Sequence, residues 1–480
     1  MSATELATIL PELVLVLAGC LLVLADAFIP SLRPRFGVLA GLACVAALVA
    51  RWTEPLPGAV WSGALVVDAL ARFVDTYILV AVLLVSIIAD AYLERTRARY
   101  GEFYGLLLWA ASGAMVMAKA DHLLVVFVGL ELLSISLYVL NAFHRESGLS
   151  LEAGWKYLVV GAVAAAVLLY GISLLYGVTG SFSLRAVAPI AASGALTGNP
   201  LAIAGVALVL AGLGFKLALA PFHAWAPDVY QGSPTPVTAF LSVVPKGAAL
   251  VVLARIAVAV APQAVTPKWT SLLAAVAVLS MVIGNLVAIA QRDLKRMLAY
   301  SGIAHMGYAV VGIVALGFDG ISGMLVYLAA YTVMNIAAFA VVSAFSENED
   351  EPHLLTDLAG QGWERPLLSF VLAVAMFSLA GIPPTAGFVG KFLVFRAAVN
   401  AHLVWLALAG VLNSLVSVFY YVRVVFYLYM KPLPKRAPRF AEPWSVRLVG
   451  IACAVAIVIL GVIPAWVLEA AEAAARTLVR

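Results

Sequence analysis

Four ionisable residues lie inside apolar runs that are long enough to cross a bilayer. Lys216, Lys246 and Lys391 each occur in such a run, and Glu131 occupies the middle of another. An ionised side chain near the bilayer centre costs roughly 2.5 to 3.5 kcal/mol on insertion scales, so residues of this kind usually serve a function. Lysine, unlike arginine, can release its proton when it is desolvated. The set is therefore typical of a route for charge through a membrane.

The composition predicts a polytopic membrane protein, because 64% of the 480 residues are hydrophobic and only 11% are charged. The formal net charge of +4 is too small and too dispersed for a nucleic-acid partner. Cys20, Cys44 and Cys453 occur singly, which supports neither a disulfide framework nor a zinc or iron–sulfur site. No basic residue precedes Arg33, so we expect the first apolar run to stay as a membrane helix.

Apolar runs near twenty residues, bounded by charges, Pro or Gly, predict an all-α protein with about fourteen transmembrane helices. The predicted spans cover residues 7–28, 36–52, 69–91, 103–118, 122–142, 153–177, 201–222, 236–258, 269–290, 297–316, 321–345, 367–397, 402–429 and 447–470.

The loops between these spans differ in charge. Sixteen Lys and Arg follow odd-numbered spans and nine lie on the opposite side, so the positive-inside rule places both termini outside. When residues near span ends are counted with the adjoining loops, four basic residues remain within spans, namely Lys156, Lys216, Lys246 and Lys391, with no arginine among them.

Two spans contain helix-breaking residues. The run 367–397 is too long for one straight span and contains Gly381-Ile382-Pro383-Pro384, while Pro221 lies five residues after Lys216. Broken helices in two halves of a chain are typical of transporters built from inverted repeats. Lys216 and Lys391 are 175 residues apart, which favours two repeats of five helices each.

A single membrane domain with four parts follows from this division. The parts are three N-terminal helices (1–102), a first repeat with helices 4–8 (103–260), a second repeat with helices 9–13 (265–430), and a basic inside loop with helix 14 (431–480). The repeat is imperfect, because span 10 has Ser301 and His305 but no acid corresponding to Glu131.

Several segments closely resemble a known family over nearly the whole chain. They are Gly129–Tyr138, Glu152–Leu158, Pro221–Tyr230, Pro234–Phe240 and Gly381–Lys391. They resemble subunit N of bacterial NADH-quinone oxidoreductase, an antiporter-like membrane subunit of respiratory complex I. The resemblance implies fourteen helices with helices 7 and 12 broken, and proton translocation driven by quinone chemistry elsewhere.

The resemblance also implies the complex and the membrane in which the chain works. It would be part of an enzyme without carrying a redox centre, because NADH, flavin, iron–sulfur clusters and quinone belong to partner subunits. The expected partners are other membrane subunits of complex I, especially adjacent antiporter-like subunits, in the bacterial inner membrane. No cofactor or metal is expected in this chain.

The resemblance assigns roles residue by residue. Glu131 matches the family's helix-5 glutamate, Lys216 its helix-7 lysine, Lys246 its helix-8 lysine and Lys391 its helix-12 lysine. Glu131 and Lys216 would form an ion pair whose opening releases the proton. Lys246 would relay the proton and Lys391 would pass it to the outer side.

Three residues have weaker signals. Lys156 follows Glu152 by four residues, which equally suits a stabilising helical pair. His305 is either a proton relay or a satisfied core histidine. His223, at a helix end, either caps the helix or admits protons from the cytoplasm. For the main lysines the alternatives are snorkelling, a fixed ion pair or, for Lys246, a kink after Pro245.

Other functions stay open at this point. They are a subunit of a multisubunit sodium/proton antiporter or other ion-pumping redox complex, an autonomous solute transporter, and a scaffold with inert buried charges. The acidic stretch 346–351 and the basic stretch 431–436 are expected to be inside loops.

Overall fold

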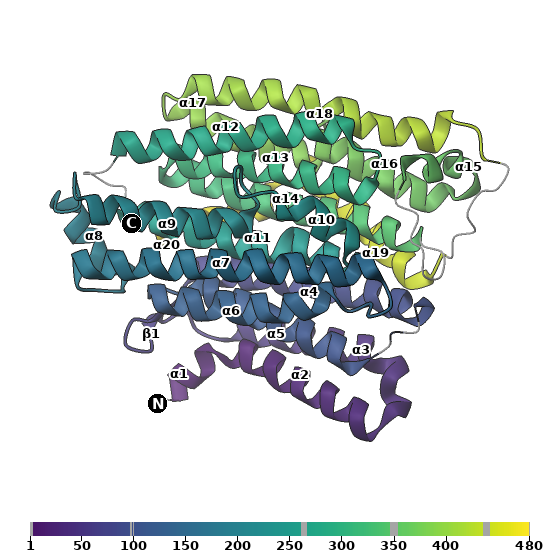
Figure 1. The fold of residues 1–480 in the computed structure, drawn as a ribbon, viewed down its shortest axis with the longest axis horizontal. Coiled ribbons are helices and arrows are strands. Elements are labelled where there is room, and N and C mark those ends of the chain that lie inside the picture. Colours follow the sequence, from purple (N-terminus) through teal and green to yellow (C-terminus); the bar gives the residue numbers. More distant parts are fainter. Residues whose placement is uncertain are drawn as a thin grey trace.

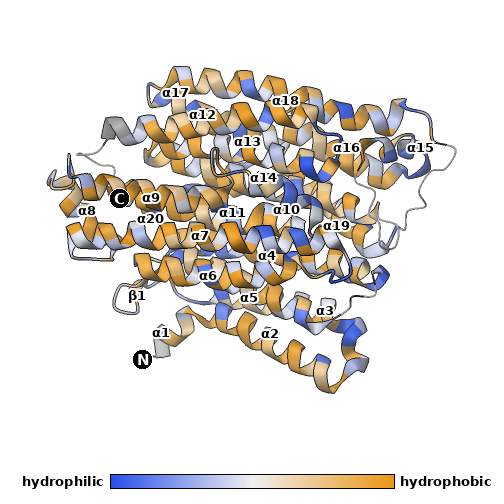
Figure 2. Cartoon of the chain, viewed as in Figure 1, coloured by the Kyte–Doolittle hydropathy of each residue, from blue (hydrophilic) through white to orange (hydrophobic). Residues whose placement is uncertain are grey.

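The computed structural model describes residues 3–96, 98, 100–260, 266–345, 354–434 and 442–479. The molecule is a bundle of helices whose long axes run side by side (Figure 1). Apolar residues dominate these helices along most of their length (Figure 2). A helix satisfies its own backbone hydrogen bonds, which is what a segment surrounded by hydrocarbon requires.

The N-terminal part lies along one side of the bundle, except for its last helix, which packs among the other helices (Figure 1). Its elements are α1 (Ala3–Thr8), α2 (Leu10–Phe28), the 3₁₀ helix η1 (Pro30–Arg35), α3 (Phe36–Thr53), the antiparallel hairpin of β1 (Gly58–Val60) and β2 (Leu65–Val67), and α4 (Ala69–Arg95). Asp68 caps α4 by accepting a hydrogen bond from the Ala71 amide at 2.8 Å.

The helices that follow fall into two groups along the chain, which cover the two predicted repeats. The first group comprises α5 (Gly101–Lys119), α6 (Leu123–Asn141), α7 (Gly148–Thr179), α8 (Leu184–Ala192), α9 (Pro200–Leu217), α10 (Trp225–Gly232) and α11 (Thr235–Val260). The second comprises α12 (Thr266–Ala290), α13 (Leu294–Ala315), α14 (Gly317–Ala344), η2 (Leu355–Leu358), α15 (Gln361–Glu364), α16 (Pro366–Ala380), α17 (Ala386–Asn400) and α18 (Val404–Met430). The chain ends with α19 (Trp444–Val462) and α20 (Ala465–Leu478).

Within the described residues, thirteen helical segments are long and apolar enough to cross a membrane. The pair α16 and α17 forms one further, interrupted crossing, so the predicted arrangement of about fourteen crossings is confirmed. The last predicted span, 447–470, is wrong at its end: α19 stops at Val462, and Pro464 precedes a separate helix. That helix, α20, is amphipathic and packs on α4 and α14.

The interruptions in helices 7 and 12 share one backbone pattern. After α9, Ala218 adopts a left-handed conformation (φ +55°), and after α16 Gly381 does so (φ +88°). The Leu219 amide then bonds the Gly214 carbonyl, and the Ile382 amide bonds the Phe377 carbonyl. This turn satisfies carbonyls that the helix end would leave unpaired. The second halves are α10 and α17.

The spacing of Lys216 and Lys391 predicted that they occupy corresponding positions in the two repeats. The positions of the interruptions show that they do not. Ala218 and Gly381 are 163 residues apart, whereas the lysines are 175 apart. Lys216 lies in the last turn of α9, before the interruption, and Lys391 lies in α17, after it. Proline and glycine mark where a helix breaks but not on which side a functional residue belongs.

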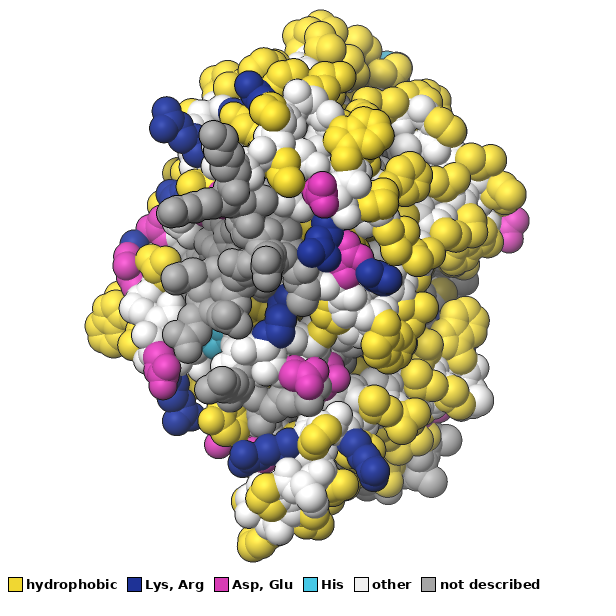
Figure 3. Space-filling model, turned by 90° about the vertical axis from the view of Figure 1, so that its right-hand side faces the viewer, with side chains coloured by type: hydrophobic (Ala, Val, Ile, Leu, Met, Phe, Trp, Pro, Cys, Tyr) yellow, Lys and Arg dark blue, Asp and Glu magenta, His cyan; other side chains and the backbone are white. Residues whose placement is uncertain are grey.

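One end of the bundle, on the right in Figure 1, carries Lys, Arg, Asp and Glu side chains, while the flanks are apolar (Figure 3). Part of the predicted inside loops falls here. The acidic stretch 346–351 and residues 435–436 of the basic stretch lie outside the described residues.

Candidate functional site: a row of buried lysines

The three predicted lysines are all removed from the surface of the chain. Lys216 is 3% exposed, Lys246 is 0% and Lys391 is 3%. They come from α9, α11 and α17, and thus from both repeats. Among the described residues, none of the three forms an ion pair with a carboxylate. Their partners are hydroxyls, carbonyls and aromatic rings.

Lys216 contacts a tyrosine that the sequence analysis missed. Its Nζ donates to the Tyr157 hydroxyl at 2.9 Å, and it lies 4.9 Å from the centre of that ring. Trp225, from the start of α10, packs against Tyr157 and donates from Nε1 to the Phe215 carbonyl at 2.9 Å. An indole thus satisfies the broken end of α9 beside the lysine. The available signal in the sequence was that aromatic residues adjoin lysines within apolar runs, as Phe215 adjoins Lys216 and Tyr157 adjoins Lys156.

Glu131 does not form the expected ion pair with Lys216 in this structure. Its Oε1 atom is buried without a hydrogen-bond partner among the described residues, while the side chain as a whole is partly exposed. Val128, Leu132 and Ile135 of the same helix, α6, are exposed around it. The carboxylate therefore lies at the apolar surface of the chain.

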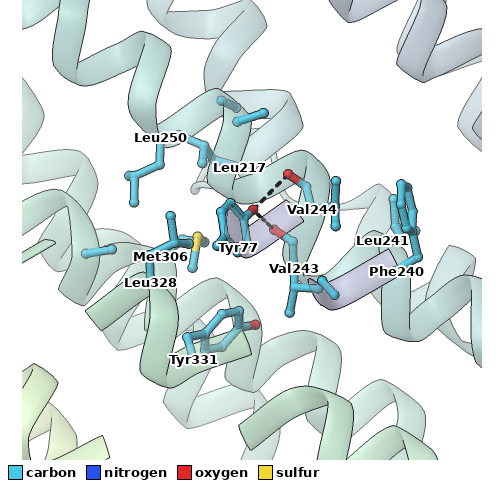
Figure 4. Close-up of a cluster of buried hydrophobic side chains, with 14 of the residues drawn as sticks. Tyr77, Leu217, Phe240, Leu241, Val243, Val244, Leu250, Met306, Leu328 and Tyr331 are labelled. Atoms are coloured by element: carbon cyan, nitrogen blue, oxygen red, sulfur yellow. Dashed lines mark hydrogen bonds between the residues drawn. The ribbon is translucent and has the colours of Figure 1, made fainter. Parts of the chain in front are cut away.

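Lys246 follows a proline within α11, and the backbone around it is contacted from the neighbouring helix α4. Pro245 cannot donate a backbone hydrogen bond within α11. The Tyr77 hydroxyl donates to the Val243 carbonyl at 2.9 Å or to the Val244 carbonyl at 3.1 Å (Figure 4). The same hydroxyl occupies the space that a side chain at Gly247 would need. Tyr77 thus fixes the backbone on both sides of the lysine.

The Lys246 ammonium faces the second repeat. It lies 5.4 Å from the centre of the Tyr230 ring and donates no hydrogen bond to a described residue. A Cβ atom at Gly302 would lie 2.7 Å from Lys246 Nζ and 2.9 Å from the Tyr331 hydroxyl. The Tyr331 hydroxyl likewise has no hydrogen-bond partner among the described residues, so Gly302 leaves the space between the two groups open.

His305 continues the row one turn along α13. The Tyr327 hydroxyl lies 2.6 Å from the Nδ1 atom of His305, and the Tyr421 hydroxyl lies 2.9 Å from its Nε2 atom. Tyr421 is also bonded to Ser301, and the Tyr331 ring packs on the imidazole. Both ring nitrogens therefore have hydroxyl partners, an arrangement compatible with a relay and with a satisfied core histidine.

Lys391 stabilises the broken end of α16. Its Nζ donates to the Leu379 carbonyl at 2.8 Å, the Ala380 carbonyl at 3.1 Å and the Ser414 hydroxyl at 2.9 Å. The partial negative charge of a helix C-terminus favours a cation in this position. The Tyr308 ring lies beneath it, 5.1 Å away.

Lys156 and His223 lie apart from this row. Lys156 is 2.6 Å from Glu152, as the spacing predicted, and also 2.6 Å from Asp228 of α10. Asp228 in turn lies 2.6 Å from Arg296 of α13, so this half-exposed network ties the two repeats together. His223 lies in the interruption before α10, and its Nδ1 atom has no described partner.

Four further basic residues are buried that the charge count had assigned to loops. Arg51, Lys119, Arg255 and Lys295 are at most 6% exposed. The prediction that lysines alone lie inside the bundle is therefore wrong. Arg51, Lys119 and Arg255 occur near the C-terminal ends of their helices, where an apolar run cannot show whether the helix end is covered.

No group of three or more His, Cys, Asp and Glu side chains in the described part of the chain could hold a metal ion. The chemistry that these residues offer is proton transfer. Fourteen crossings, two interrupted helices and a row of buried lysines define an antiporter-like membrane protein. Residues 120–417 match the family described as NADH:quinone oxidoreductase/Mrp antiporter, TM, and the chain belongs to this family.

Within that family, the chain belongs with subunit N. It is 42% identical to NADH-quinone oxidoreductase subunit N of Trichlorobacter lovleyi, over 98% of this chain and 97% of the relative. It is similar to a chain of respiratory complex I from Thermus thermophilus with bound aureothin, with 35% identity, a TM-score of 0.82, and coverage of 96% of this chain and 99% of that one. A chain of the Mrp complex from Dietzia shares the fold, with a TM-score of 0.86, 22% identity, and coverage of 100% and 98%.

Gly302→Ala tests the passage between Lys246 and Tyr331. The added methyl group would lie 2.7 Å from the ammonium, so one of the two groups must move. Overpacking typically costs 1 to 3 kcal/mol, and about 1.4 kcal/mol on a transfer barrier slows it about tenfold. We expect proton translocation by the assembled complex to slow by about this factor, as measured in membrane vesicles.

Gly177→Ala is the matched control, because it also adds a methyl group inside a helix but meets nothing within 4 Å. Equal effects of the two substitutions would show that the space at Gly302 has no special role.

Proposed function

We propose that this chain translocates protons as subunit N of NADH-quinone oxidoreductase, coupled to NADH oxidation and quinone reduction in other subunits. The observation that carries the proposal is the buried row of lysines, tyrosines and histidine from α9 to α17, in a chain that matches subunit N relatives over nearly its whole length. A row of this kind is typical of intramembrane proton paths.

In the proposed mechanism, Glu131 controls the charge of Lys216. A carboxylate beside a buried ammonium stabilises it, and withdrawal of the carboxylate leaves that charge without a counter-charge. Two observations support this role: among the described residues Glu131 Oε1 has no hydrogen-bond partner, and Lys216 donates to Tyr157 instead of to a carboxylate. Release of the proton toward Lys246 then removes the uncompensated charge.

The second repeat would carry the proton onward. Lys246 would pass it to the Tyr331 and His305 region, across the space at Gly302, and water molecules would complete the remaining steps. Lys391 would receive it and release it to the periplasmic side. His223 and Lys156, at the opposite approach to Lys216, would serve proton entry from the cytoplasm.

A neighbouring membrane subunit would cover Glu131. A carboxylate exposed to lipid at this depth costs roughly 2.5 to 3.5 kcal/mol, and its neighbours Val128, Leu132 and Ile135 are exposed with it. An adjacent antiporter-like subunit that offers a basic or hydroxyl group to Glu131 would remove this cost. The family relation supports such an assembly, in the bacterial inner membrane with both termini periplasmic. NADH, flavin, iron–sulfur clusters and quinone would be held by partner subunits.

A sodium/proton antiporter subunit is the second candidate, favoured by the shared fold of the Mrp complex chain from Dietzia. The identity to subunit N is higher, at 42%, and favours the first proposal. Translocation that depends on sodium would support the antiporter instead.

Lys216→Ala and Glu131→Ala test the proposed mechanism. Each removes one of the two charges that must alternate, so we expect most proton translocation per NADH oxidised to be lost. The measurement is made on assembled complex in membranes. Lys431→Ala, which removes an exposed lysine at the end of α18, serves as the control. Normal pumping and turnover in assembled Lys216→Ala would refute the mechanism.

Lys391→Arg separates a proton carrier from a structural cation. The guanidinium keeps the charge that stabilises the end of α16 but does not release a proton under these conditions. We expect the assembled variant to lose most proton translocation, whereas Lys431→Arg at the surface should leave it unchanged. Full pumping by Lys391→Arg would assign the lysine an anchoring role only.

A further inference from the structure

A second group of buried charges lies where α2 and α4 begin and α3 and α5 end. Lys119 donates to Glu12 and, at 3.0 Å, to Asp75. The Arg51 Nε atom lies 2.9 Å from the same Asp75 oxygen, and its NH1 atom lies 3.5 Å from Glu54. We call these five residues the N-terminal charge cluster. None of them takes part in the proposed lysine row.

The cluster lies well inside the bundle. The Arg51, Asp75 and Lys119 side chains are fully buried, and those of Glu12 and Glu54 are 5% and 8% exposed. Asp75 lies seven residues after the cap of α4, about 10 Å along the helix at 1.5 Å per residue. Besides Glu131, Asp75 is thus an acid well inside a predicted span. Glu54, which follows the end of α3, has the most exposed side chain of the five, although both of its carboxylate oxygens are buried.

Glu54 is the extra acid of the cluster. Glu12 and Asp75 share Lys119 and Arg51 between them, which balances two negative and two positive charges. Glu54 has only the longer contact with Arg51, and neither carboxylate oxygen has a hydrogen-bond partner among the described residues. Burial, opposed by Arg51, raises the pKa of the Glu54 carboxyl above its ordinary value.

The other charged residues around Glu54 already have partners. Arg72 of α4 donates to the Glu54 backbone carbonyl at 2.8 Å and stacks on Trp52. Asp68 lies 3.8 Å from Arg255 of α11.

Helix α20, which also packs on α4, pairs its own Glu472 and Arg476 and exposes Glu469. A change of charge on Glu54 would therefore be felt first by Arg51, and through Arg51 by Asp75.

We propose that Glu54 is a proton-binding site that exchanges protons between the N-terminal charge cluster and the medium at this end of the bundle. The step adds one proton to the Glu54 carboxylate and gives the neutral acid, with no other bond changed. The inference rests on the proposed function, because the proton is taken to be one that the subunit translocates. The site would be a periplasmic exit in the predicted orientation.

The fold connects this site to the lysine row through one helix. Asp75 of the cluster and Tyr77, which donates to the α11 backbone beside Lys246, are two residues apart in α4. Charges this deep in a protein interact far more strongly than they do in water. A proton on Glu54 thus changes the electrostatic surroundings of the helix that positions Lys246.

Glu54→Gln is the decisive variant. It removes the titratable group at nearly constant size, and because neither oxygen forms a hydrogen bond among the described residues, assembly should be retained. We expect fewer protons translocated per NADH oxidised in assembled complex, and loss of one carboxylic-acid band from acid-minus-neutral infrared difference spectra. Glu54→Asp, which keeps a carboxyl group, should restore both readouts at least in part.

Asp26→Asn is the matched control. Asp26 is a buried acid at the opposite end of α2, where it pairs with Arg33 and accepts from the Gly101 amide. It should lower stability without changing the proton ratio or the infrared band of Glu54.

Unchanged pumping and spectra in assembled Glu54→Gln would overturn this inference. If Lys216→Ala were impaired in the same experiments, the proposed function would stand without the Glu54 site. Normal pumping by Lys216→Ala would instead refute the proposed function itself.

Discussion

Polar groups inside an apolar bundle must find their partners within the protein, and this requirement organises the whole structure. A backbone group without a hydrogen bond costs several kcal/mol in hydrocarbon. The broken helices 7 and 12 meet this requirement with left-handed turns and with nearby donors. Trp225 satisfies the end of α9, and Lys391 satisfies the end of α16. The backbone carbonyls at these two interruptions therefore have hydrogen-bond donors within the protein.

The same requirement explains why the lysine row is rich in tyrosine. A hydroxyl can donate or accept, so it remains a partner whether the neighbouring lysine is charged or neutral. A carboxylate beside each lysine would instead fix the positive charge in place. Tyr157 at Lys216 and Ser414 at Lys391 supply neutral oxygen partners of this adaptable kind. By contrast, Lys119 touches two carboxylates, as expected of a fixed cation.

Much of the fold could be predicted from the sequence, because apolar length and helix-breaking residues act locally. The crossings, the two broken helices and the burial of Lys216, Lys246 and Lys391 follow from such signals. The N-terminal charge cluster could not be predicted, since Arg51 and Lys119 look like ordinary helix-end residues until other helices cover them. The roles of Asp228, Tyr157 and Tyr77 likewise could not be predicted, because their partners lie far away in the sequence.

The hydrogen bonds of Lys391 link its protonation state to the orientation of a neighbouring side chain. An ammonium group has three N–H donors, and Lys391 bonds three acceptors, the carbonyls of Leu379 and Ala380 and the Ser414 hydroxyl. A neutral amine has only two donors. After loss of the proton, the two remaining N–H groups can still donate to the two carbonyls, and the Ser414 hydroxyl must turn from acceptor to donor toward the nitrogen lone pair. The protonation state of Lys391 is in this way coupled to the orientation of a hydroxyl group on α18.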